Sequence, residues 1–129
     1  MLDFLSKGLK KVFGTKSDRD VKELEPYITT TNAAYALLQS LTNDELRGKT
    51  KELQDYIGEK LAHIDDEIKS LKLSIETDED MSIDDKEAVF RRVDDLEKQR
   101  DVELEAVLEE ILPRAFAIVK ETARRFKEN

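Results

Sequence analysis

The stretch IGEKLAHIDDEIKSLKLSI, residues 57–75, decides the fold class of this chain. Its apolar side chains recur at alternating steps of four and three residues, which is the a/d spacing of a heptad repeat. The positions concerned are Ile57, Leu61, Ile64, Ile68, Leu71 and Ile75. This spacing predicts a long α-helix whose apolar stripe must be covered by a partner.

A matching stripe runs through residues 89–111, with one extra step of four residues. Its positions are Val89, Val93, Leu96, Arg100, Leu104, Val107 and Ile111. The short segment TDEDM, residues 77–81, separates the two stripes and has no apolar period. Two stripes of similar length joined by a short acidic turn predict that helices 44–75 and 83–111 form a long antiparallel, coiled-coil-like hairpin.

The ends of the predicted helices carry capping signals. Thr42 and Glu45 have the spacing of a capping box, and Ser17 and Ser82 are suitable N-caps for the helices that follow them. Pro26 lies inside the helical pattern of residues 17–38 and predicts a kinked helix there. Pro113 predicts the first turn of a separate closing helix. The apolar stripe of that closing helix is Phe116, Val119, Ala123 and Phe126.

The N-terminal segment predicts a short basic amphipathic helix. Its apolar face consists of Leu2, Leu5, Leu9, Val12 and Phe13, and its basic face consists of Lys7, Lys10 and Lys11. Such a helix can lie on an anionic bilayer, dock on another protein, or pack on its own domain. We therefore expect an all-α chain with this helix at residues 1–16 and a helical domain at residues 17–129, into which a hairpin at about residues 51–111 is inserted.

Composition supports helices and limits the chemistry. Of 129 residues, 40% are charged, four are Gly and two are Pro, which is too few turn residues for a β-sandwich or barrel. The absence of Cys excludes disulfides, Cys-ligated metals and thiol catalysis. The sequence has no recognisable signal peptide and no apolar run approaching the roughly 18 residues of a membrane span, so we expect a cytoplasmic location.

Charge is distributed unevenly along the chain. The net charge is −8, with −11 on residues 59–112 and +3 on residues 1–16. Phosphate repulsion by the acidic part predicts that nucleic acid is not a partner. The many carboxylates of residues 59–112 are most simply a solvated helical face, because general acid–base catalysis needs a carboxyl with a shifted pKa in a cleft.

Other candidate sites are weaker. Glu59, His63 and Glu67 share one helix face and could ligate a metal, but His63 falls at an outward position, so we favour a solvated surface histidine. Arg100, at a core heptad position, could anchor a partner, although a side chain that extends its head into water is the preferred interpretation. No Gly-rich phosphate loop of either common type is present.

Three stretches carry a resemblance to a known family: GLKKVFGTKSDRD (8–20), LTNDELRGKT (41–50) and LPRAFAIVKETARR (112–125). In order and character they resemble the extreme N-terminus of the SecA family, the ATP-driven motors of bacterial preprotein translocase. Two features depart from the family pattern. The segment between Lys51 and Ile111 is longer than the usual connection, and Arg114 stands where an acidic residue is common.

The resemblance implies a parent protein that binds ATP and Mg²⁺ and moves preproteins through the SecYEG channel, on the inner face of the cell membrane. It implies that residues 2–13 bind anionic lipid, the channel or a second copy of the motor. We expect the chain to be an N-terminal piece without catalytic residues or a cofactor of its own, and to self-associate through its heptad stripes. The alternative is a free-standing coiled-coil adaptor or scaffold.

Overall fold

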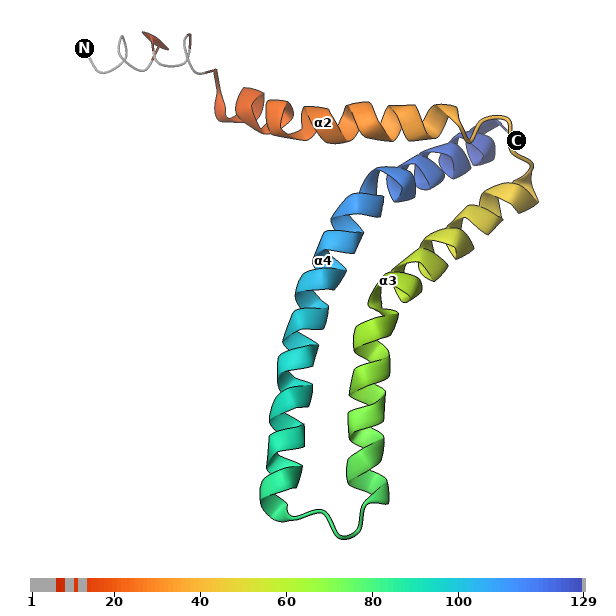
Figure 1. Ribbon diagram of the computed structural model, residues 1–129. Helices are drawn as coiled ribbons and strands as arrows, with labels where there is room; N and C mark the ends of the chain where they lie inside the picture. Colours follow the sequence, from red (N-terminus) through yellow and green to blue (C-terminus); the bar gives the residue numbers. More distant parts are fainter. Residues whose placement is uncertain (1–6, 9–10, 12–13, 129) are drawn as a thin grey trace.

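The computed structural model describes residues 7–8, 11 and 14–128. Within them the chain forms three long helices, α2 (Lys16–Ala36), α3 (Asn43–Thr77) and α4 (Ile83–Glu128), and the described residues contain no strand. α3 and α4 run side by side as a hairpin, and α2 lies across the end of the hairpin that is far from its turn (Figure 1). The predicted all-α class and the predicted hairpin are both confirmed.

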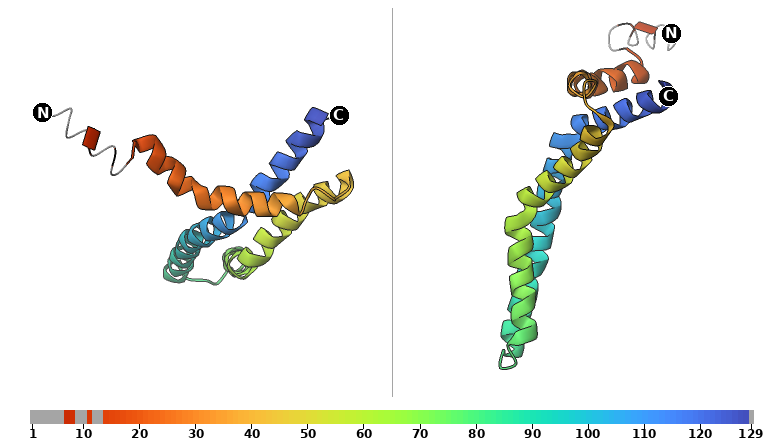
Figure 2. Two further views of the ribbon diagram at one scale, coloured as in Figure 1. Left: turned by 90° about the horizontal axis from the view of Figure 1, so that it is seen from above. Right: turned by 90° about the vertical axis from the view of Figure 1, so that its right-hand side faces the viewer.

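The hairpin is held together by the two predicted stripes. Ile64, Ile68, Val93 and Leu96 form one buried cluster, with Leu71 packed against it. Leu61 and Leu96 are each only 1% exposed. Full burial of one such side chain contributes about 1.5–3 kcal/mol, so these contacts dominate the stability of the hairpin. Figure 2 shows the hairpin from two further directions.

Polar pairs border this apolar seam. Arg100 donates to the carboxylate of Asp65 on the facing helix, so its head is paired and not simply solvated as we expected. The other pairs across the hairpin are Arg92–Glu67, Lys72–Glu97, Tyr56–Glu110 and His63–Glu103. All involve partly or largely exposed groups, so each pair contributes little to stability.

The helix ends agree with the predicted caps at two places and differ at a third. Thr42 and Glu45 form the predicted capping box, and the Ser82 hydroxyl accepts from the backbone N–H of Asp85. The cap of α2 is Thr15 and not Ser17. Asp18 explains the difference, because it stands three residues after Thr15 and completes a capping box in which it accepts from the Thr15 backbone N–H at 2.9 Å.

The sequence predicts a kink at Pro26 and the start of a new helix at Pro113. In the structure both prolines lie inside a continuous helix. α2 continues through Pro26, as predicted. α4 also continues through Pro113, so the prediction of a separate closing helix is wrong. Ile111 and Ala117, on either side of Pro113, are both buried against the other helices, and this packing outweighs the lost hydrogen bond of a mid-helix proline. Figure 1 shows α4 bending in its blue part instead of ending.

The second buried cluster joins α2 to the hairpin. It contains Leu38, Leu46 and Ala117, with Ala34, Tyr35, Leu41 and Ile118 packed around it. Ala117 is 0% exposed, and its small side chain lets the α2–α3 connection approach α4 closely. No helix among the described residues contains a stretch that is both long and apolar enough to cross a bilayer.

Candidate functional site

The corner where α2, α3 and α4 meet holds a buried charge cluster. Glu121 of α4 is 0% exposed. Arg124 donates to it from Nε at 3.0 Å and from Nη2 at 2.6 Å, and Arg125 donates from Nε at 2.8 Å. Two guanidinium groups therefore neutralise a single buried carboxylate, which is the condition under which such burial is tolerated.

Arg125 also ties α4 to the connection between α2 and α3. Its Nη2 donates to the backbone oxygen of Leu41 at 2.6 Å and of Leu38 at 3.3 Å. Its Nη1 donates to Oδ1 of Asn43, the first residue of α3, at 2.8 Å. One side chain thus fixes the corner, because it bonds to α4, to the connection and to α3 together.

The electrostatics of this corner follow from these hydrogen bonds. Bonds from Arg124, and next from Arg125, hold the pKa of the Glu121 carboxyl at about 2, below its usual 4.5. Burial acts in the opposite direction but is the weaker influence. The same contact raises the pKa of Arg124. The cluster therefore stays fully ionised at neutral pH and has a structural role rather than a role in proton transfer.

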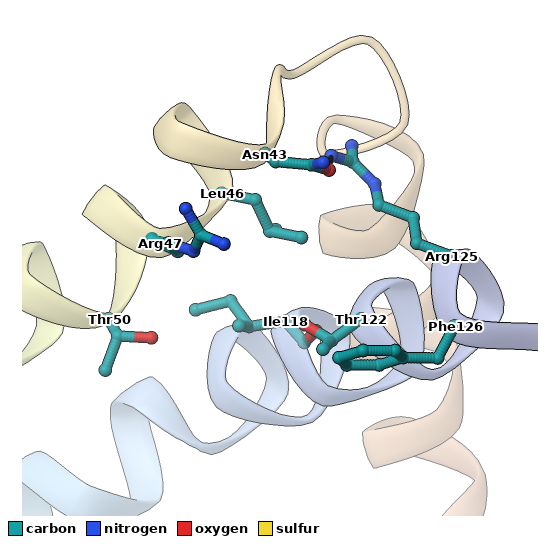
Figure 3. Close-up of a pocket in the computed structure, with 8 residues that line it drawn as sticks. All are labelled: Asn43, Leu46, Arg47, Thr50, Ile118, Thr122, Arg125 and Phe126. Carbon is teal, nitrogen blue, oxygen red and sulfur yellow. Dashed lines mark hydrogen bonds between the residues drawn. The ribbon is translucent and has the colours of Figure 1, made fainter. Parts of the chain in front are cut away.

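An open hollow lies beside the cluster (Figure 3). Leu46, Arg47 and Thr50 of α3 line one side, and residues of α4 line the other. The α4 residues are Ile118, Thr122, Arg125 and Phe126, and Asn43 completes the lining. Leu46 makes the floor apolar, whereas Phe126 is 81% exposed at the rim. The lining is therefore mixed, because polar and charged side chains stand beside the apolar ones.

The predicted apolar stripe of the closing segment is largely exposed in the structure. Phe116 is 52% exposed, Val119 66% and Phe126 81%. α2 and α3 cover the side of α4 that carries Ala117 and Glu121, and they leave most of the surface of this stripe open. An exposed apolar row of this kind is typical of an interaction surface.

A second, apolar groove lies between α2 and α4. Its lining residues are Leu24, Tyr27, Ile28, Thr31, Asn32, Phe116 and Lys120. Lys120 holds the two helices at this place, donating to Oδ1 of Asn32 at 2.9 Å and lying 4.2 Å from the centre of the Tyr35 ring. Leu24 and Ile28 remain 55% and 52% exposed, and Val21 one turn earlier is 58% exposed.

Most of the predicted membrane- and channel-binding residues lie outside the described residues. This applies to Leu2, Leu5, Leu9, Lys10, Val12 and Phe13. Lys7 and Lys11 are described, and both are helical and exposed. The role of this face in binding a membrane or channel stays a prediction.

The other candidate residues fall on the hairpin surface. His63 is 61% exposed, as expected for a surface histidine, and its Nε2 lies 3.1 Å from a carboxylate oxygen of Glu103. In the part of the chain that the structure describes, no three His, Cys, Asp or Glu side chains converge as metal ligands would. Glu121, Arg125 and Asn43 were missed by sequence reasoning. The Glu–Arg spacing of four residues was visible, but nothing in the pattern signalled burial.

Comparison with known proteins identifies relatives over nearly the whole chain. The family described as the SecA DEAD-like domain matches residues 9–129. The protein translocase subunit SecA of Cytophaga hutchinsonii is 47% identical over 121 residues, covering 94% of this chain and 11% of that protein. The subunit of the same name from Phocaeicola vulgatus is 46% identical over 119 residues, covering 92% and 11%.

The segment that forms the hairpin lies inside the region matched by a relative. The SecA subunit of Flavobacterium psychrophilum is 43% identical over 128 residues and covers 99% of this chain, so the match includes residues 51–111. The chain spans about a tenth of the length of the curated relatives it matches, 11% in these three cases. No solved structure matches the chain.

Proposed function

Because this chain belongs to the SecA family, we propose that it serves as the N-terminal part of a protein-translocation motor and attaches that motor to its membrane site. Its relatives are named protein translocase subunits, and this chain matches about a tenth of their length. Attachment is the contribution that its own residues support best. Family membership is the observation that carries the proposal, and it favours the motor over a free-standing adaptor.

The basic amphipathic segment supports attachment to an anionic surface. Lys7 and Lys11 are exposed, and the first sixteen residues carry a net charge of +3. Leu2, Leu5 and Leu9 supply apolar side chains that can enter the boundary between headgroups and acyl chains. The proposed partners are anionic lipid at the inner face of the cell membrane, the SecYEG channel and, for the whole motor, an unfolded preprotein.

ATP and Mg²⁺ belong to the remainder of the proposed motor. This chain holds neither of the Gly-rich phosphate-binding motifs, and its buried ionised cluster at Glu121 is already neutralised by two arginines. The proposed role of these residues is to hold the motor at its membrane site and to position it there.

Vesicle binding tests the attachment. The 129-residue chain is sedimented with vesicles of equimolar phosphatidylglycerol and phosphatidylcholine, and separately with phosphatidylcholine alone. We expect binding to the anionic vesicles only, weakening as salt is raised. Each Lys near an anionic surface contributes about 1 kcal/mol, so replacing Lys7, Lys10 and Lys11 by Gln should weaken binding by about a hundredfold.

A matched triple variant provides the control. Replacement of Lys51, Lys69 and Lys98 by Gln removes the same charge from exposed positions of the hairpin. We expect this variant to bind anionic vesicles like the unaltered chain. Equal loss in both triple variants would show that overall charge, and not the N-terminal segment, governs binding, and would contradict the proposal.

We also propose self-association through the exposed α4 stripe. The heptad stripes cover each other within one chain, so a second copy would have to use Phe116, Val119 and Phe126 instead. Sedimentation velocity at increasing concentration tests this. The double variant Val119→Ser with Phe126→Ser should remain monomeric where the unaltered chain associates.

A further inference from the structure

We infer that the α3–α4 hairpin projects away from the bilayer when the chain is attached to an anionic membrane, with α2 at the surface and the turn at residues 78–82 remote from it. The inference rests on the attachment proposed above and adds to it the side of the molecule that faces the lipid. The lipid-facing surface is the end of the molecule that carries α2, and the hairpin lies in the aqueous phase.

Nearly all of the excess negative charge lies on the hairpin. Residues 59–112 carry nineteen acidic and eight basic side chains, a net charge of −11. The rest of the chain carries fourteen basic and eleven acidic side chains, a net charge of +3. Residues 76–87, around the turn, carry −6 on their own. An anionic bilayer therefore repels the hairpin, and most strongly its turn, while it attracts the rest of the chain.

The length of the hairpin allows it to escape this repulsion. From Gly58 to Thr77, α3 extends about 30 Å at 1.5 Å per residue. The electrostatic field of the surface decays over about 8 Å at physiological ionic strength. In a projecting hairpin the acidic turn lies several decay lengths from the lipid, whereas a hairpin lying flat brings both of its helices into the field. Projection is therefore the arrangement of lower electrostatic energy.

The packing of α2 on the hairpin permits this orientation. Figure 1 and Figure 2 show α2 across the end of the hairpin and not along its length. Two polar contacts hold α2 there, because the Tyr27 hydroxyl donates to Glu109 and Lys120 donates to Asn32 at 2.9 Å. α2 can therefore lie along a surface while the hairpin points away from it. The charge of the hairpin opposes the alternative in which both lie flat.

Exposed apolar side chains near the turn do not reverse this conclusion. Ile83 is 83% exposed and Phe90 is 54% exposed, and apolar side chains of this kind can enter a bilayer. Asp84, Asp85 and Glu87 lie between them in the sequence, so inserting both would carry three carboxylates into the negative field. The pair therefore stays in the aqueous phase when the chain is attached.

Fluorescence quenching by lipid tests the orientation, and the chain has no cysteine of its own to interfere with labelling. A fluorophore is attached to Ser17→Cys at the start of α2 or to Thr77→Cys at the end of α3, both exposed and uncharged positions. The vesicles are equimolar phosphatidylglycerol and phosphatidylcholine and include a lipid with a nitroxide on its headgroup. The nitroxide quenches only fluorophores close to the headgroups. We expect loss of fluorescence at position 17 and no loss at position 77.

Acrylamide, a neutral quencher in the aqueous phase, provides the control. It should quench the label at position 77 equally with and without vesicles. Protection of position 77 from acrylamide, or its quenching by the nitroxide lipid, would overturn the inference, because the hairpin would then lie on the surface. Absence of nitroxide quenching at both positions in vesicle-bound chains would also overturn it, because α2 would not lie at the surface.

Sedimentation of the same mixtures separates this inference from the attachment on which it rests. A labelled chain that sediments with the vesicles and is quenched at position 77 is attached, so only the orientation is contradicted. A chain that does not sediment with the anionic vesicles contradicts both the attachment and the orientation.

Discussion

Nε of Arg125 lies 2.8 Å from Oε1 of Glu121, and this contact fixes the corner at which the three helices meet. The same guanidinium donates to the backbone oxygens of Leu38 and Leu41, in the connection between α2 and α3. The position of α2 relative to the hairpin therefore depends on a buried ion pair as well as on apolar packing. The geometry of any surface formed jointly by α2 and α4 therefore depends on the contacts at this corner.

Glu121→Gln should lower the free energy of unfolding by about 3–5 kcal/mol. The carboxylate is fully buried, and its removal leaves the guanidinium groups of Arg124 and Arg125 without their shared counter-charge. Urea denaturation followed by circular dichroism at 222 nm gives the change directly.

Glu128→Gln is the matched control for this variant. Glu128 also accepts from Arg124, but its side chain is 60% exposed. An exposed pair contributes about 1 kcal/mol or less, so this variant should unfold close to the midpoint of the unaltered chain. Similar decreases in the free energy of unfolding in the two variants would show that burial of Glu121 does not add to the stability of the fold.

The lowered pKa of Glu121 predicts how the stability of the chain depends on pH. The pKa of Glu121 is about 2 in the folded chain, against a usual 4.5. A depressed carboxyl pKa contributes stability that is complete above the unfolded value and is lost as pH falls through the folded value. The contribution of Glu121 should therefore disappear between about pH 4.5 and 2. In the Gln variant the unfolding free energy should change less over this range, and an unchanged slope would contradict the assigned ion pair.

The hairpin could be predicted from sequence because its packing repeats along the chain. Leu61, Ile64 and Ile68 recur with the period of a helix, and the residues they contact on α4 recur in the same way. Local patterns of this kind also predicted the capping box at Thr42, since all its atoms lie within four residues.

The corner could not be predicted in this way, because it depends on contacts between residues more than eighty positions apart. Arg125 bonds to Leu41 and Asn43, and no local pattern relates these residues. The continuation of α4 through Pro113 has the same origin, since packing of Ile111 and Ala117 on other helices decides it. The exposed row of Phe116 and Val119 had the correct helical period, but period alone does not reveal whether a partner covers it.

Ala117→Leu should destabilise the corner by about 1–3 kcal/mol, as overpacking of a closely packed site does. Ala117 is 0% exposed between Leu38 and Leu46, so a larger side chain must displace the α2–α3 connection from α4. Thermal unfolding followed by circular dichroism measures the effect. Ala123→Leu, the same change at an exposed position of the same helix, should leave the midpoint almost unchanged. A lower unfolding midpoint in Ala123→Leu but not in Ala117→Leu would contradict the assigned packing of Ala117 against Leu38 and Leu46.

Gly48→Ala and Gly58→Ala should each stabilise α3 by about 1 kcal/mol, the difference in helix propensity between the two residues. Both glycines lie inside α3, and an added Cβ would have no neighbouring atom within 4 Å at either position. Gly14 has the only positive φ among the described glycines, so neither helical glycine needs special backbone freedom. Urea midpoints of the two single variants and the double variant provide the measurement, and the two gains should add because the sites do not touch. If Gly48→Ala stabilises the chain but Gly58→Ala destabilises it, then the bend of α3, which Figure 1 shows in its yellow-green part, requires the glycine at position 58.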